Sequence, residues 1–346
     1  MIKRMDYQEE VSVIIPFYNA EKYISTCVAS LKAQTCENFR AYFIDDGSKD
    51  DSVRLIKSFK DDRFVLIQQE KKGVSAARNL GIDHASGEYL AFVDVDDEFA
   101  PDYLEKLVAA ASENHVDVVL CNYIERYADG RQTEVLLPWP DGMIDRQVIQ
   151  EELIPGMIAA KRPKRAIKGL VWRTFTRRKF WEATKLRFNE EIFTAEDLLL
   201  LLALYNRTEK IYILQDCLYI YRRNSASTLN SYDPDALRFR NFHKALIRTL
   251  EEEGLISENF TRCQASEISG YTIAISNLAR GPSFTDCQKK IKLLRDSLIS
   301  EAIDYKSCTY IGWIKKLSLW MLEHRMYSLL LILFKGKEWF RLKRFF

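Results

Sequence analysis

The sequence predicts an α/β protein whose doubly wound sheet is followed by a helical C-terminal region. Three observations support this fold class. Short apolar segments of strand type alternate with segments of helical periodicity through the N-terminal part of the chain. Polar residues directly follow three of the short segments. From about residue 231 onward the apolar residues recur at helical spacing, so we expect one domain over residues 1–235 and a second over residues 236–346.

The N-terminal elements follow from this pattern in order. Residues 11–16 (VSVIIP) form a continuous apolar run, which is typical of a strand buried on both faces of a parallel sheet. Residues 21–34 then carry Ile24, Val28 and Leu31 at helical spacing. Similar reasoning predicts strands at residues 41–44, 65–68, 89–93 and 116–121, and helices at 52–59, 75–84, 101–114 and 194–204. Residues 127–141 are polar and contain proline and glycine, which indicates an excursion from the sheet.

The polar clusters at residues 17–19, 45–48 and 94–97 each follow a predicted strand. Right-handed crossovers place the carboxyl ends of parallel strands along one edge of the sheet. Open α/β sheets bind their ligands at that edge. We therefore expect the three clusters to lie together and to form a binding site.

Composition and charge exclude several kinds of protein. A formal net charge of +2 is too small to indicate a nucleic-acid-binding protein. The seven cysteines are scattered without a CxxC pair, and the four histidines are far apart, so we expect reduced thiols and no zinc site. The N-terminus has no apolar leader segment, and the most apolar stretch, residues 326–334, is too short to span a membrane. These features predict a cytoplasmic protein, either soluble or peripheral at the inner face of the cell membrane.

Asp94 and Asp96 are two residues apart, directly after a predicted strand. In an extended segment both carboxylates would face the same ligand. Mg²⁺ or Mn²⁺ commonly binds one or two carboxylates together with phosphate oxygens, which a nucleotide diphosphate would supply. The alternative is an acidic turn that caps the helix expected near Pro101.

Four motifs in register resemble the inverting glycosyltransferase family 2, which has the GT-A fold and includes enzymes that assemble bacterial polysaccharides. They are VSVIIPFYN at residues 11–19, DDGS at 45–48, GVSAARN at 73–79 and GEYLAFVDVDD at 87–97. The resemblance extends over about residues 11–227. It implies that Tyr18 stacks on the nucleotide base, that Asp46 accepts from the base N3–H, and that Arg78 lies near the base or diphosphate. It further implies that Asp94 contacts the ribose and Asp96 holds Mn²⁺ or Mg²⁺, with Pro16, Asn19 and Val95 also in the nucleotide site. A solvated helix arginine is the alternative for Arg78.

Glu196 and Asp197 open a predicted apolar helix, where acidic residues are favoured by the helix dipole alone. The family resemblance implies instead that Asp197 is the general base, with Glu196 beside it. It also implies that residues 219–227 form a loop that closes the nucleotide site, in which Arg222 or Arg223 reaches the diphosphate and Ser227 contributes. Trp172 is a candidate for stacking on the acceptor sugar, with a core tryptophan as the alternative.

The resemblance implies transfer of a hexose or N-acetylhexosamine, with inversion, from a nucleotide-diphosphate sugar to a glycan or lipid-linked glycan. UDP is the expected nucleotide. The alternatives are a protein or glycopeptide acceptor, and a non-catalytic sugar-nucleotide-binding scaffold. Residues 311–346 combine basic residues with Trp, Phe and Leu. Such a tail is typical of an anionic membrane surface, and the alternative is packing on the catalytic domain or on a second subunit of a homo-oligomer.

Overall fold

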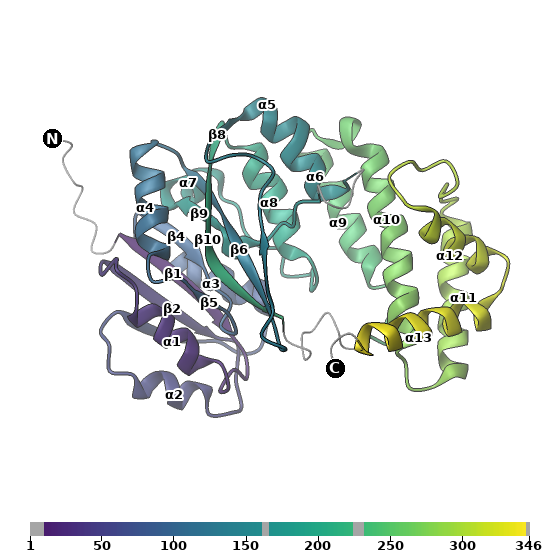
Figure 1. The fold of residues 1–346 in the computed structure, drawn as a ribbon, viewed down its shortest axis with the longest axis horizontal. Helices are drawn as coiled ribbons and strands as arrows, with labels where there is room; N and C mark the ends of the chain where they lie inside the picture. The colour runs from purple at the N-terminus through teal and green to yellow at the C-terminus, as the bar shows by residue number, and fades with distance from the viewer. Residues whose placement is uncertain (1–9, 161–165, 224–231, 344–346) are drawn as a thin grey trace. The chain divides into compact units, whose positions relative to one another are not determined.

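A computed structural model of the protein describes residues 10–160, 166–223 and 232–343, with side chains up to residue 336. The chain forms two compact units (Figure 1). The first consists of Met1–Ile154 and Lys168–Arg223, and the second of Pro155–Ile167 and Asn224–Phe346. The boundary expected after residue 235 lies inside the second unit, and the short segment 155–167 was not expected to belong there.

The first unit is built on one mixed sheet with the strand order β3-β2-β1-β4-β9-β6-β10-β5. Its strands are β1 (Val11–Phe17), β2 (Phe39–Asp45), β3 (Phe64–Gln68), β4 (Tyr89–Phe92), β5 (Glu98–Phe99), β6 (Val118–Tyr127), β9 (Thr174–Arg177) and β10 (Lys210–Arg223). The first four are parallel, as are β6 and β10, and β9 joins the two blocks through antiparallel pairing. Within the expected excursion, β7 (Gln132–Val135) pairs with β6, and β8 (Gly142–Asp145) follows it and pairs with β10.

Helices cover both faces of this sheet. The side chains of Val11, Val13 and Ile15 alternate with Ile14 along β1, and they pack in one cluster with α1 (Ile24–Lys32) and α4 (Tyr103–Glu113). On the other face, α3 (Val74–His84) packs so closely that a Cβ on Gly81 would lie 2.4 Å from Ile14. The remaining helices of this unit are α2 (Ser52–Ser58), α5 (Arg146–Val148), α7 (Arg178–Thr184) and α8 (Glu196–Asn206), with a π-helical turn at Ile149–Leu153 and a 3₁₀ turn at Val171–Arg173.

The strand register confirms that the polar clusters share one edge. Phe17 pairs with Asp45 and Asp45 with Gln68, so β1, β2 and β3 end together. The strand β4 pairs with β1 up to Phe92 opposite Ile14, and Asp94 follows two residues later. The predicted strands and helices before residue 115 are all present. One expectation is wrong: Tyr219–Arg223 is the end of the long strand β10 and not a loop. Residues 224–231, including Ser227, lie outside the described part of the chain.

The second unit contains α6 (Ile154–Ile158, of which Ile154 belongs to the first unit), α9 (Phe239–Glu252), α10 (Ile256–Ala279), α11 (Phe284–Ser300), α12 (Trp313–Glu323) and α13 (Tyr327–Lys343). Its separate apolar core includes Ile275 of α10, Leu294 of α11, Leu322 of α12 and Leu331 of α13. The expected helical C-terminal region is thus confirmed. No helix in the described part of the chain has the length and apolar character needed to cross a bilayer.

Candidate functional site

The acidic motif after β4 is a turn. The backbone N–H of Asp97 donates to the carbonyl of Asp94 at 3.1 Å, and residues 95–96 form the turn itself. The expectation of an extended segment is therefore wrong, because the chain reverses here to start β5. The alternative of a helix cap is also wrong, since β5 and Pro101 separate this turn from α4.

Tyr219 of β10 supports the acidic turn through two hydrogen bonds. Its buried hydroxyl donates to Asp97 Oδ2 at 2.9 Å and accepts from the backbone N–H of Asp94 at 3.0 Å. The other oxygen of Asp97 accepts from the backbone N–H of Arg222 at 2.8 Å. Burial, and then the neighbouring Asp96 and Asp94, raise the pKa of Asp97 well above its ordinary value. Asp97 therefore supports the turn. The other two carboxylates of the turn, Asp94 and Asp96, are half-buried.

Trp172 belongs to the core and does not stack on a sugar. It is 2% exposed, and its ring stacks on Tyr219 with centroids 4.2 Å apart. It also meets Tyr123 edge-on at 4.8 Å. The acceptor-stacking expectation for Trp172 is thus wrong, because its ring packs against Tyr219 and Tyr123 within the main core.

Arg78 joins the two acidic motifs. It lies on α3 and is only 4% exposed, so the solvated alternative is wrong. Its Nη2 contacts Asp94 at 3.0 Å, and its Nη1 contacts Glu196 at 2.8 Å and Asp197 at 2.7 Å. Burial alone would lower the pKa of Arg78, but the surrounding carboxylates raise it. A single buried guanidinium therefore holds three carboxylates from two distant parts of the sequence.

Asp197 is nearly buried at the start of α8. One carboxylate oxygen accepts from Arg78, and the other accepts from the backbone N–H of Val171 at 3.2 Å. Burial raises the pKa of the Asp197 carboxyl to about 7; Arg78 opposes this rise, while Glu196 and Asp94 add to it. A carboxylate with a pKa near neutrality is matched to proton transfer at cellular pH.

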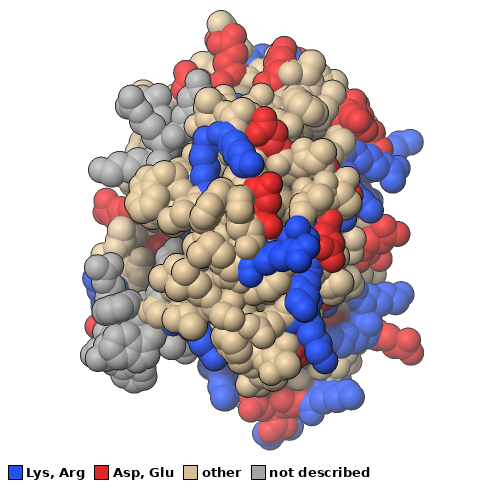
Figure 2. All heavy atoms as spheres, turned by 90° about the vertical axis from the view of Figure 1, so that its right-hand side faces the viewer, with Lys and Arg blue, Asp and Glu red and all other residues tan. Residues whose placement is uncertain are grey.

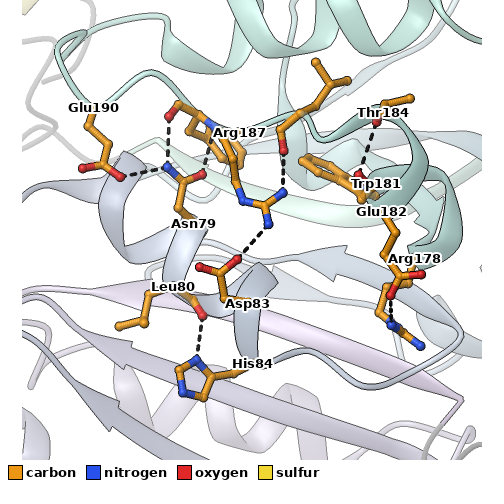
Figure 3. Close-up of polar contacts among 12 residues, drawn as sticks. Asn79, Leu80, Asp83, His84, Arg178, Trp181, Glu182, Thr184, Arg187 and Glu190 are labelled. Atoms are coloured by element: carbon orange, nitrogen blue, oxygen red, sulfur yellow. Dashed lines mark hydrogen bonds and ion pairs between the residues drawn. The ribbon is translucent and has the colours of Figure 1, made fainter.

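The loop that leads to Asp197 is anchored on α3 by the residue after Arg78. The Asn79 amide donates to the carbonyl of Phe188 and to Glu190, both at 3.0 Å, and accepts from the backbone N–H of Phe188 at 2.9 Å (Figure 3). One turn further along α3, Asp83 pairs with Arg187 at 2.8 Å (Figure 3). The helix that carries Arg78 therefore also positions the chain before α8.

At the opposite end of the edge, Asp46 is buried in the turn after β2. Its oxygens accept from Gln69 Nε2 at 2.8 Å and from the backbone N–H groups of Lys72 and Gly73 at 2.7 and 2.9 Å. A carboxylate has about four acceptor sites, so this arrangement leaves room for one more donor. The base contact of Asp46 stays a prediction.

Tyr18 is 38% exposed, and the Lys71 ammonium lies 3.6 Å from its ring centroid. Asn19 Oδ1 accepts from the backbone N–H of Lys49 at 2.8 Å, which ties the chain after β1 to the turn after β2. Pro16, in contrast, is buried in β1 opposite Ile44, so we assign it to the sheet rather than to direct nucleotide contact.

Val95 and the two arginines of β10 complete the predicted residues. Val95 is half-buried against the main core. Arg222 contacts Glu98 at 2.7 Å, directly after the acidic turn. Arg223 points to Glu125 at 2.8 Å, because successive strand residues face opposite sides. The structure thus distinguishes the two, and Arg222 is the one beside the acidic turn.

The carboxylates of the acidic turn are the candidate ligands for a divalent metal. No cluster of three His, Cys, Asp or Glu side chains arranged to hold a metal occurs among the described residues. Mg²⁺ and Mn²⁺ with nucleotides need only one or two carboxylates plus phosphate oxygens. Asp96, whether alone or with Asp94, fits that donor set, and a diphosphate would supply the remaining ligands.

Tyr219, Asp97, Val171 and Asn79 were not assigned roles in the site from the sequence. Tyr219 and Val171 act through positions that only the tertiary structure reveals. Asn79 and Asp97 are the last residues of the motifs at 73–79 and 87–97, and that position was the available signal.

The chain is similar in sequence to known glycosyltransferases. The family model for glycosyl transferase family 2 matches residues 12–181. The uncharacterized glycosyltransferase EpsJ of Bacillus subtilis is 33% identical over 219 residues, which cover 63% of this chain and 62% of EpsJ. Glycosyltransferase GlyG of Streptococcus pneumoniae is 32% identical, over 64% of this chain and 74% of GlyG. The chain therefore matches less than two thirds of the length of EpsJ.

Two solved structures share the fold at low sequence identity. S. aureus TarS 1-349 in complex with UDP-GlcNAc superposes with a TM-score of 0.66 at 19% identity, over 95% of this chain and 91% of that one. The mannosyltransferase PcManGT from Pyrobaculum calidifontis, in complex with GDP-Man and Mn²⁺, gives 0.51 at 15% identity, over 95% and 88%. These matches confirm the GT-A fold. The family model, together with the 32% identity to GlyG over 74% of its length, shows that the chain belongs to glycosyl transferase family 2.

Proposed function

We propose that this protein transfers a hexose or N-acetylhexosamine, with inversion, from a nucleotide-diphosphate sugar to a glycan or lipid-linked glycan. The observation that carries the proposal is the Arg78 cluster, which brings Asp94 of the donor motif and Asp197 of α8 onto one guanidinium. The matches to TarS with UDP-GlcNAc and to PcManGT with GDP-Man support a nucleotide-sugar donor, and we propose UDP as its nucleotide.

In this proposal Asp197 is the general base. Its carboxylate takes the proton of the acceptor hydroxyl while that oxygen attacks the anomeric carbon. The bond from the anomeric carbon to the diphosphate breaks in the same step, and the electron pair leaves with the diphosphate. One displacement inverts the anomeric configuration. Arg78 and the Val171 N–H hold the carboxylate in place, and its raised pKa suits it to accept a proton near pH 7.

The donor residues keep the roles that the family resemblance implies. Tyr18 and Asp46 would bind the base, Asp94 the ribose, and Asp96 a Mn²⁺ or Mg²⁺ ion. When bound, the metal would offset the negative charge that develops on the departing diphosphate. Arg222, beside the acidic turn, is our choice for a protein cation near the diphosphate, because guanidinium groups suit phosphate oxygens.

Phe193 takes the place of Trp172 as the proposed acceptor contact. It is 68% exposed and lies four residues before Asp197, on the loop that Asn79 anchors. An exposed aromatic side chain close in sequence to the proposed general base is suited to stacking on an acceptor sugar.

All seven cysteines are free thiols, which supports a reducing, cytoplasmic location.

The substitution Asp197→Asn tests the catalytic role. We expect it to lower kcat by at least about 100-fold, because the amide cannot accept the proton. Donor binding should persist, measured as a rise in melting temperature with UDP-sugar and Mn²⁺, since only a ligand of the folded state stabilises it. Glu191→Gln, an exposed acidic residue of the same loop, is the matched control and should keep normal turnover.

Turnover by Asp197→Asn equal to that of the wild type would contradict the base role. A wild-type protein that binds nucleotide sugars but transfers none to glycan, lipid-linked glycan or peptide acceptors would instead support the non-catalytic scaffold. Transfer to peptide acceptors alone would replace the proposed acceptor with a protein side chain.

A further inference from the structure

The outer face of α12 is apolar and uncovered. Trp313, Ile314, Leu317 and Trp320 are all exposed, with Trp313 at 72%, and their spacing places them on one side of the helix. The opposite side, with Leu319 and Leu322, is buried in the core of the second unit. These four exposed residues define the α12 outer face. They are apolar, and they do not belong to the core of the second unit.

The helix α13, which contacts α12, also exposes apolar side chains. Leu329, Ile332 and Leu333 are exposed there, whereas Leu330 and Leu331 are buried. Soluble monomers rarely leave contiguous apolar faces of this kind uncovered. The tail is thus divided by the fold into residues that complete the core and residues that face outward.

Basic residues are concentrated in the same region. Residues 306–346 contain nine Lys or Arg residues and only two acidic ones, although the whole chain has a formal net charge of +2. The rest of the chain is therefore net negative. Arg325 is exposed between α12 and α13, and Lys335 is exposed on α13. Lys306, before α12, is exposed and pairs with Glu323 at 3.3 Å. Figure 2, which views the side of α11 to α13, shows uncharged surface with both basic and acidic side chains around it.

We propose that the α12 outer face docks on an anionic lipid bilayer. Tryptophan favours the boundary between lipid and water, because its ring is apolar and its N–H is polar. Leu and Ile beside it would enter the acyl region, and the flanking cations complement anionic headgroups. The helix would lie in the plane of the surface, as no described helix is suited to crossing it.

Vesicle co-sedimentation with the full-length protein tests this inference. We expect binding to phosphatidylcholine vesicles that contain phosphatidylglycerol, little binding without it, and weakening by salt. Trp313→Ser combined with Trp320→Ser should reduce the bound fraction at least about tenfold. Phe260→Ser with Ile273→Ser, two exposed apolar residues of α10, is the matched control and should bind normally.

The proposal would be overturned by a wild-type protein that does not sediment with anionic vesicles. It would also be overturned by a tryptophan variant that sediments as well as the wild type. If that variant also changes the oligomeric state, measured by light scattering, the face would be assigned to a second copy of the chain. The melting-temperature rise with UDP-sugar and Mn²⁺ should be the same in the variant and the wild type, so a failure here leaves the proposed transfer reaction untouched.

Discussion

Arg78 shows what one side chain contributes to the site. Three carboxylates surround its buried guanidinium, and all three contacts are between 2.7 and 3.0 Å. Removing one partner of a buried ion pair is costly because the other charges stay buried without compensation. Arg78 is also the strongest influence that lowers the pKa of Asp197, so it acts on both stability and the proposed base.

The first prediction concerns pH and Arg78 together. The base works in its deprotonated form, so wild-type kcat should be half-maximal near pH 7, approach its full value above about pH 8 and fall about tenfold per pH unit below about pH 6. Arg78→Lys keeps a charge but loses the planar fork, and should shift the midpoint of this profile to higher pH. Arg78→Met should shift it further and lower the free energy of unfolding by about 3–5 kcal/mol.

The pH profile of kcat and urea unfolding measure these effects. Arg54→Met is the control, since its ion pair with Asp51 is exposed and should change the free energy of unfolding by no more than about 1 kcal/mol. A profile with the same midpoint in Arg78→Lys as in the wild type would show that Arg78 does not tune the base.

At the scale of elements, the parallel block β1–β4 and its helices were predicted from periodicity and turn residues, because each element there is local. The long strand β10 was missed because residues 219–223 (YIYRR) mix aromatic and charged residues without a clean alternation. Trp172 was ambiguous for a similar reason, since its burial depends on stacking with Tyr219, which is distant in the sequence. Local sequence does not encode such contacts.

The backbone before β4 passes close to the start of β1, and this contact leads to a second prediction. A Cβ on Gly87 would lie 2.7 Å from the backbone nitrogen of Ser12, at the start of β1. Gly87→Ala should therefore force the backbones apart and lower the free energy of unfolding by about 1–3 kcal/mol. Gly312→Ala, where nothing lies within 4 Å, should change the free energy of unfolding by less than about 0.5 kcal/mol. Equal urea midpoints for the two variants would contradict the packing at Gly87.

At the scale of the whole molecule, residues 155–167 belong with the helical unit although they interrupt the first. Arg262 of α10 donates to the carbonyl of Ala159 at 2.6 Å, and Ala159 packs against the second core. Sequence periodicity could not reveal that this segment belongs to the second unit, because the segment is short and its partners come about a hundred residues later.

A truncated chain tests this organisation. Ending the protein after residue 235 should remove the partners of the 155–167 segment and expose Met157 and Ile158, which are buried in the full chain. We expect the free energy of unfolding to fall by about 2 kcal/mol or more, with increased binding of a hydrophobic dye. A truncated chain that unfolds at the same urea concentration as the full-length protein would contradict this prediction.

The sequence by itself determined the fold class, the shared edge of the sheet and the acidic motifs, because strand periodicity and turn chemistry are local properties. Only the tertiary structure decided that Asp94 lies in a turn, that Arg78 is buried between two acidic motifs, and that Trp172 belongs to the core. It also divided the tail into buried and exposed apolar residues. These outcomes depend on contacts between residues far apart in the chain, where burial and charge pairing, rather than local pattern, set the energy.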